Sequence, residues 1–149
     1  MNRNPKRMPS FVRGLFIACA ALLLAACAGS ASMPLAGTYW NVKQVGEQRF
    51  KPLKGGRDAH LRLDAQQKRA TGYSGVNSFS GAYESGAASL KFGPLAATRR
   101  AGPPAAMAFE AALFKALEAT RSYRVSGEML ELLDAEGGVL ARLEALAGL

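Results

Sequence analysis

The sequence predicts an α+β domain in which mostly antiparallel strands form a curled sheet or a partly open barrel, with one packed helix at about residues 105–120. Three observations lead to this fold class. Short alternating runs of polar and apolar residues are separated by glycine-containing turns, one stretch has helical periodicity, and the strand pattern then returns. Successive hairpins that share one core usually curl into a sandwich or a partly closed barrel, whose open side the helix would cover.

The first 26 residues have the three parts of a cleaved secretory signal. Met1 to Gly14 contains four cations and no acid, Leu15 to Ala26 is almost entirely apolar, and two alanines precede Cys27. The apolar run is shorter than the roughly 20 residues that a relaxed transmembrane helix needs. A cleaved signal is therefore preferred to a membrane anchor or a buried helix.

The signal ends in Leu24-Ala25-Ala26-Cys27, which resembles a bacterial lipobox. The resemblance implies that Cys27 carries a diacylglyceryl thioether, becomes the first residue of the mature chain, and offers an amine for a further acyl chain. Two or three chains anchor a protein stably, whereas one holds it only marginally. Because Ala28 is small and neutral, the same resemblance implies sorting to the outer membrane. We expect a lipid-anchored protein that faces the periplasm.

Removal of the signal changes the cysteine count and the charge. Cys19 leaves with the signal and Cys27 carries lipid, so the mature chain has no pair of thiols for an internal disulfide. Four of the 19 Lys and Arg also leave, which leaves 15 against 11 Asp and Glu in 123 residues. That length suits one domain. The modest, interspersed positive charge and the export signal argue against nucleic acid as a partner.

A short tether at residues 27–34 leads into a domain expected over residues 35–149. His60 to Asp64 alternates most clearly, with Leu61 and Leu63 inward and His60 outward. Gly81 indicates a bulge or a barrel corner. The strands expected before the helix are Thr38 to Val45, Gln48 to Pro52, His60 to Asp64, Lys68 to Ser74, Asn77 to Tyr83 and Ser89 to Phe92.

Helical periodicity is confined to Ala105 to Thr120. Two prolines precede it, as is favourable at a helix start, where the missing N–H would have no partner. Phe109, Leu113, Ala116 and Leu117 form the apolar stripe, and Glu110, Lys115 and Glu118 are expected mostly off it. Three further strands are predicted afterwards, at Arg121 to Val125, Met129 to Asp134 and Val139 to Leu143, and the last two are expected to form a hairpin.

Two motifs resemble those of the META/HslJ-like domain family of bacterial envelope proteins. Residues 75–83 read GVNSFSGAY, similar to a glycine-cysteine-asparagine signature, and the segments LKF at 90–92 and LAATRRA at 95–101 are similar to a second motif. Trp40, Glu110 and the terminal Leu130 to Leu143 hairpin support the match. The resemblance covers nearly the whole mature chain, and it implies a link to heat shock and drug tolerance without supplying a mechanism.

One departure from the family pattern makes a structural prediction. Members of the family often have cysteine where this chain has Val76, and another near Gly102. We expect Val76 and Gly102 to be neighbours that ordinary packing joins here and a disulfide joins in relatives.

Four residues of these motifs are candidates for a ligand or partner contact: Asn77, Thr98, Arg99 and Arg100. Asn77 could touch a ligand, but the favoured interpretation is a turn in which Gly75 has a positive φ and Asn77 bonds nearby backbone. Arg99 and Arg100 could bind an anionic headgroup or an acidic patch. Alternatively, Thr98 holds the loop while both arginines are solvated, and this second interpretation is preferred.

No catalytic or metal-binding set emerges from the sequence. His60 is the single histidine and has no thiol beside it, which argues against zinc; a serine triad would need it as the base and lacks a nucleophile elbow. No cofactor is expected. The aromatic residues either build the core, as we expect, or line a ligand cavity: Trp40, Phe50, Tyr73, Phe79, Tyr83 and Phe92.

These observations predict a monomeric, non-enzymatic envelope lipoprotein that serves a stress or envelope-integrity role through contacts with envelope proteins. The alternative is a barrel-like carrier or sensor of a lipid or another apolar ligand. An apolar cavity of a few hundred Å³ would favour the alternative.

Overall fold

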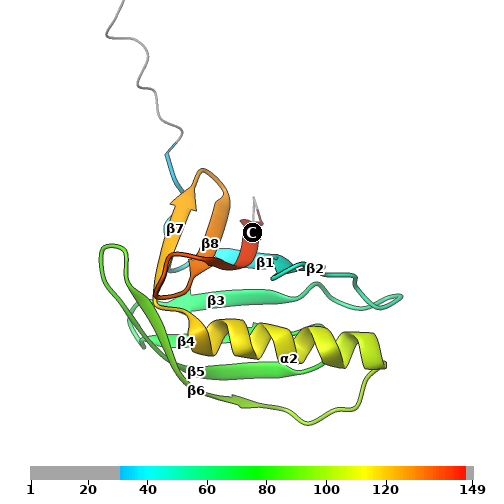
Figure 1. Cartoon of the computed structure of the whole chain (residues 1–149). Coiled ribbons are helices and arrows are strands. Elements are labelled where there is room, and N and C mark those ends of the chain that lie inside the picture. The colour runs from blue at the N-terminus through cyan, green and yellow to red at the C-terminus, as the bar shows by residue number, and fades with distance from the viewer. Residues whose placement is uncertain (1–30, 147–149) are drawn as a thin grey trace, which may run out of the picture. The chain divides into compact units, whose positions relative to one another are not determined.

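The structure, a computed structural model, describes residues 31–146 and confirms the predicted fold class. One helix and nine strands make up the described domain (Figure 1). Their bounds are β1 Tyr39–Val45, β2 Gln48–Arg49, β3 His60–Asp64, β4 Arg69–Tyr73, β5 Ser78–Ser85, β6 Leu90–Ala97, α2 Pro104–Ala119, β7 Ser122–Ser126, β8 Met129–Leu133 and β9 Val139–Ala145. The predicted signal and Cys27 lie outside the described residues.

All paired strands are antiparallel and form one curled sheet in the order β6-β5-β4-β3-β1-β9-β8-β7, with β2 paired to β1 alone. The two end strands meet at one corner only, where Ser89 bridges Ser122 and Leu90 N donates to Arg121 O at 3.1 Å. The sheet is therefore a partly open barrel. Helix α2 lies across the sheet and covers its concave side (Figure 1).

The predicted helix is confirmed to within one residue at each end. Pro104 is its first residue, and the predicted stripe of Phe109, Leu113, Ala116 and Leu117 is buried. The helix ends at Thr120, whose backbone is extended and whose buried hydroxyl donates to Ala116 O at 2.8 Å. The prediction for Glu110 is wrong, because this carboxylate is buried beside Phe109.

Trp40 is the central residue of the core. Its indole is fully buried, and Nε1 donates to Leu35 O at 2.9 Å, which satisfies the polar end of an otherwise apolar side chain. Leucines from five elements surround the centre of the barrel and leave it filled: Leu61, Leu63, Leu90, Leu113, Leu117, Leu130, Leu132 and Leu143.

The aromatic prediction is confirmed for Trp40, Phe79, Tyr83 and Phe92, and it is wrong for Tyr73. Tyr73 pairs with His60 across β3 and β4, so alternation places its ring on the outer face of the sheet. There the guanidinium of Arg57 lies 4.5 Å from the ring centroid. Phe50 is half-buried and packs at the edge of the core, not within it.

Most strand bounds lie within two residues of the sequence prediction, and β2 and β6 differ the most. The expected strand at Gln48 to Pro52 is only two residues long, because Pro52 and the following loop leave the sheet. β5 and β6 instead extend to Ser85 and Ala97. A register shift between Gly81 and Tyr83 confirms the predicted bulge, and it lets these two long strands stay paired as the sheet curls.

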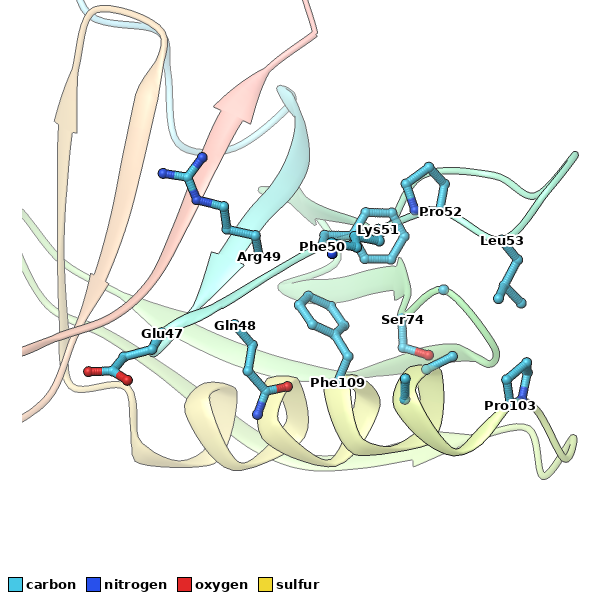
Figure 2. A pocket seen from close by; sticks show the side chains of 13 residues that line it. Glu47, Gln48, Arg49, Phe50, Lys51, Pro52, Leu53, Ser74, Pro103 and Phe109 are labelled. Carbon is cyan, nitrogen blue, oxygen red and sulfur yellow. The ribbon is translucent and has the colours of Figure 1, made fainter.

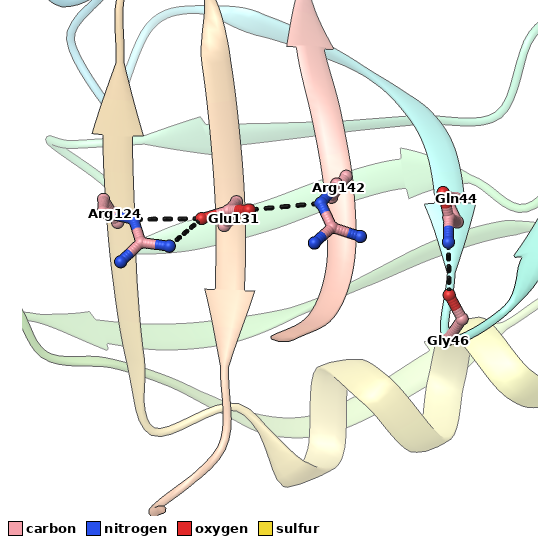
Figure 3. Close-up of polar contacts among 5 residues, drawn as sticks. All are labelled: Gln44, Gly46, Arg124, Glu131 and Arg142. Atoms are coloured by element: carbon pink, nitrogen blue, oxygen red, sulfur yellow. Dashed lines mark hydrogen bonds and ion pairs between the residues drawn. The ribbon is translucent and has the colours of Figure 1, made fainter. Parts of the chain in front are cut away.

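An ion-pair cluster crosses the outer face of β7, β8 and β9 (Figure 3). Arg124 Nε donates to Glu131 at 3.0 Å, and Arg142 Nε donates to the other carboxylate oxygen at 3.2 Å. Arg124 chiefly, together with Arg142, lowers the pKa of Glu131. Because the folded pKa lies below the unfolded value, this contribution to stability is present near neutral pH and is lost as the pH falls through the folded pKa.

The chain enters the domain beside the β7–β8 turn. Met33 N donates to Gly127 O at 2.9 Å, and the Thr38 hydroxyl donates to Pro34 O at 2.6 Å. Within residues 31–146, no helix is long and apolar enough to cross a membrane.

Glycine at position 72 provides a test of the strand packing. A Cβ there would lie 2.3 Å from both His60 O and Phe79 Cζ, whereas a Cβ on Gly93 would meet nothing closer than 3.5 Å. We expect Gly72→Ala to lower the free energy of unfolding by about 1–3 kcal/mol and Gly93→Ala to change it by less than about 0.5 kcal/mol. Urea unfolding followed by tryptophan fluorescence measures both. Equal stability of the two variants would contradict the register described for β3, β4 and β5.

Candidate functional site

Three of the six buried polar residues in the described part of the chain, Ser74, Asn77 and Glu110, gather where the β4–β5 turn meets the start of α2, and the exposed Thr98 borders them. We call Ser74, Asn77, Thr98 and Glu110 the Asn77 cluster. Asn77 Nδ2 donates to Glu110 Oε1 at 3.0 Å and to Arg100 O at 3.2 Å. Its Oδ1 accepts from the Thr98 hydroxyl at 2.8 Å and from Arg100 N at 2.7 Å. The carboxamide therefore joins the turn, the loop after β6 and the helix.

Ser74 completes the cluster from the other side of the turn. Its hydroxyl hydrogen-bonds the second oxygen of Glu110, and its Oγ accepts from Asn77 N at 2.9 Å. Gly75 between them has a φ of +101°, a conformation that residues with a Cβ rarely adopt. The favoured interpretation of this motif is confirmed: it is a structural turn, with Asn77 bonded to nearby backbone.

Glu110 is the cluster member whose position the sequence analysis predicted wrongly. Helical spacing places Glu110 at the border of the apolar stripe. It is buried because the β4–β5 turn packs against this border. Its carboxylate is acceptable there because Ser74 and Asn77 both hydrogen-bond it. The sequence signal for this contact was that the motif containing Asn77 occurs together with a glutamate, Glu110, at the start of the helix.

The remaining candidate residues separate into a loop anchor and two solvated cations. The Thr98 hydroxyl, besides donating to Asn77, accepts from Ser78 N at 3.2 Å and fixes the loop as predicted. Arg100 contributes its backbone to the cluster, and the side chains of Arg99 and Arg100 are exposed. A role for these two guanidinium groups in binding stays a prediction.

Val76 and Gly102 are neighbours, as the departure from the family pattern predicted. A Cβ built on Gly102 would lie 3.0 Å from both methyl carbons of Val76. Val76 is buried, so its methyls occupy the space that a bridge would take.

A surface groove lies directly over the Asn77 cluster, between α2 and the segment that follows β1 (Figure 2). We call it the Phe50 groove. The rings of Phe50 and Phe109 both line it and pack against each other, with centroids 5.1 Å apart and planes tilted by 55°. It holds about 620 Å³ and is lined by Glu47, Gln48, Arg49, Phe50, Lys51, Pro52, Leu53, Ser74, Gly75, Pro103, Ala105, Ala106 and Phe109.

The cluster and the groove share Ser74, and other lining residues are direct sequence neighbours of the cluster, so the cluster shapes the groove. Ser74 and Gly75 belong to the turn below, and Phe109 is adjacent to Glu110 on the helix. A Cβ on Gly75 would lie 2.8 Å from the Phe50 ring, so the glycine permits this close approach. The groove was not predicted from the sequence, although the apolar and cationic residues after Glu47 were a signal for it.

The outer face around His60 offers no comparable site. The His60 ring stacks on Tyr39 with centroids 4.3 Å apart and lies 6.3 Å from Tyr73. Burial between these rings lowers the pKa of His60, which favours the neutral imidazole. Within residues 31–146, no three His, Cys, Asp or Glu side chains are grouped so as to hold a metal ion.

The geometry defines a class of protein: a half-open antiparallel barrel covered by one helix, in which a buried asparagine joins the helix to the barrel. The chain belongs to the META domain family, whose model matches residues 33–147.

Two structures determined by NMR share the fold. One, of a protein from Burkholderia xenovorans, is 24% identical with a TM-score of 0.60 and covers 76% of this chain and 85% of its own. The other is 15% identical with a TM-score of 0.58, covering 74% and 90%. At these identities the likeness shows the fold alone. No curated protein sequence matches this chain significantly.

Two glutamates of the same helix test the Asn77 cluster. Glu110→Ala leaves the buried Ser74 and Asn77 groups short of a partner, so we expect the free energy of unfolding to fall by about 1–3 kcal/mol. The exposed Glu118→Ala is the matched control and should change it by less than about 0.5 kcal/mol. Urea unfolding curves give both values. A Glu110→Ala variant as stable as Glu118→Ala would show that the cluster does not hold the helix.

Proposed function

We propose that this protein is a non-enzymatic, lipid-anchored protein of the outer membrane, facing the periplasm, that serves envelope integrity or stress tolerance by binding other envelope proteins through the Phe50 groove. The observation that carries the proposal is the groove itself. It is apolar along its floor, open to solvent and built over a rigid, fully hydrogen-bonded turn. Binding sites for ligands and partners are commonly built on loops that a rigid scaffold holds in place.

Charge around the groove indicates the kind of partner. The lining of the Phe50 groove contains two cations, Arg49 and Lys51, and one acid, Glu47. A second groove of about 690 Å³, between β6 and the end of α2, has two acids and two cations in its lining. The Phe50 groove is thus the one with a charge bias, and it suits an acidic segment with apolar side chains.

The backbone beside the groove favours an extended partner. β2 pairs only with β1, at two residues. In the described part of the chain, the backbone of residues 51–57 makes one internal hydrogen bond, from Gly56 N to Leu53 O at 2.7 Å. Its other N–H and C=O groups are free to pair with an added strand, a common mode of peptide recognition.

The groove also lies far from the point where the chain enters the domain. β1 begins at Tyr39, whose carbonyl accepts from Leu146 N near the tether, and it ends at Val45, which pairs with Gln48 beside the groove. Seven residues of extended chain span about 20 Å. An anchor at Cys27 therefore leaves the groove open to partners on the side away from the lipid.

A carrier of an apolar ligand is the second candidate, and one observation favours it. The volume of the groove lies within the range of about 300–1,000 Å³ that is usual for small-molecule sites. The barrel interior, by contrast, is filled by Trp40 and the core leucines, so an internal lipid site lacks support.

The anchor is tested by Cys27→Ser. Without the thiol no thioether can form, so we expect the protein to move from the membrane fraction to the soluble periplasmic fraction. Fractionation and intact-mass measurement of the membrane form check this. Ala28→Ser, which keeps Cys27, is the control and should stay in the membrane fraction. A Cys27→Ser protein that stays with the membrane would overturn the anchor.

The groove is tested by a photo-crosslinking amino acid at Leu53 in the lipidated protein in cells, with Lys115 on the far part of α2 as the control position. We expect defined protein adducts from position 53 alone, and identification of the adducts by mass spectrometry to show an acidic segment. Arg49→Glu with Lys51→Glu should reduce these adducts at least tenfold, because the charge attraction is reversed.

Two outcomes would contradict the proposed partner. Adducts of position 53 with lipids or small apolar molecules would favour the carrier. Equal protein adducts from positions 53 and 115 under several stresses would show that the groove selects no partner.

A further inference from the structure

We propose that the end of the domain opposite the Phe50 groove is a seat that rests on the bilayer surface and orients the domain. This inference depends on the lipid anchor of the proposed function, but it adds a second, non-covalent contact with the membrane. We define the seat by Met33, Pro34, Arg62, Met129 and Leu146.

Exposed apolar side chains are the first evidence for a contact surface at this end of the domain. Of the residues that the structure describes, three large hydrophobic ones are more than a third exposed: Leu53 at 39%, Met129 at 37% and Leu146 at 42%. Leu53 lines the Phe50 groove. The other two lie where the chain enters the domain, so they need a different occupant.

Backbone hydrogen bonds place both side chains at the chain entrance. Met129 begins β8 directly after the turn whose Gly127 O accepts from Met33 N. Leu146 follows β9, and its N–H donates to Tyr39 O at 2.9 Å. Because Met129 pairs with Glu144, and side chains alternate along a strand, Met129 and Leu146 lie on the same outer face of the sheet.

A shallow hollow of about 600 Å³ joins the tether to this face. It is lined by Met33, Pro34, Leu146 and Arg62 among others, and Arg62 is its one charged lining residue. An apolar surface with a guanidinium at its margin matches the boundary between acyl chains and phosphate headgroups. The nearby carboxylate of Glu144 is paired with Lys43 at 3.1 Å, and that of Glu128 is exposed at the turn.

The length of the tether identifies the occupant. Cys27 is six residues before Met33, whose N–H donates to the turn at Gly127, and six extended residues reach at most about 22 Å. With the acyl chains in the membrane, the turn at Gly127 stays within that distance of the headgroups. The lipid surface is thus the one partner that chain connectivity keeps beside Met129 and Leu146 at high effective concentration.

The seat is tested on the full lipidated protein in vesicles of phosphatidylethanolamine and phosphatidylglycerol. Leu146→Cys and Leu53→Cys are each labelled with the fluorophore bimane. Since Cys19 leaves with the signal and the Cys27 sulfur carries lipid, each introduced thiol is the only one available. Both positions are exposed, so both variants should fold.

Quenching by lipids with a nitroxide near the headgroup gives the result, and flotation of the vesicles is measured in the same samples. We expect quenching of the label at position 146 to exceed that at position 53 at least threefold. Floating protein with equal quenching at the two positions overturns the seat while the anchor stands. Protein that does not float overturns the anchor, and the seat with it.

Discussion

The carboxamide of Asn77 is the contact on which the arrangement of the helix and the sheet depends. The backbone hydrogen bonds of the sheet hold the strands, and the loop after β6 is joined to β5 at its start by Thr98 N and Ser78 O at 3.0 Å. These bonds do not tie the helix and the rest of this loop to the β4–β5 turn. Asn77 supplies these links by bonding Glu110 on the helix and both backbone groups of Arg100 in the loop. A buried amide left without these partners would cost about 1–3 kcal/mol for each unmet group, so the amide couples the positions of the three segments.

The position of the groove follows from this contact. Glu110 is fixed by Ser74 and Asn77, and the helical spacing then sets Phe109 over the turn. Gly75 lets the Phe50 ring approach from the other side. The groove is therefore lined by a contacting pair of aromatic rings whose position is set by buried hydrogen bonds, while the loop from Lys51 to Arg57 is the part that can adjust to a partner. A rigid floor with an adaptable edge lowers the entropic cost of binding.

Sequence patterns predicted the features that depend on local periodicity. The alternation of His60 to Asp64 and the helical stripe from Phe109 to Leu117 were both confirmed, because each element buries one face against a single core. The predictions were wrong for residues whose burial depends on how distant segments pair and pack. Tyr73 lies outward because of its pairing with His60, and Glu110 is interior because a turn 33 residues away meets it. No local pattern encodes either contact. The groove likewise could not be predicted locally, because it forms between the segment after β1 and helix α2.

The proposed anchor and seat together limit which partners the groove can meet. The twelve residues from Cys27 to the start of β1 span at most about 43 Å and β1 adds about 20 Å, so the groove lies no more than about 63 Å from the headgroups. If the seat rests on the bilayer, the tether is slack and the distance falls toward the strand length alone. The acidic segment that fits the cationic margin at Arg49 and Lys51 must then be presented close to the membrane. Membrane-bound envelope proteins meet this requirement, whereas freely diffusing periplasmic proteins spend most of their time outside this layer.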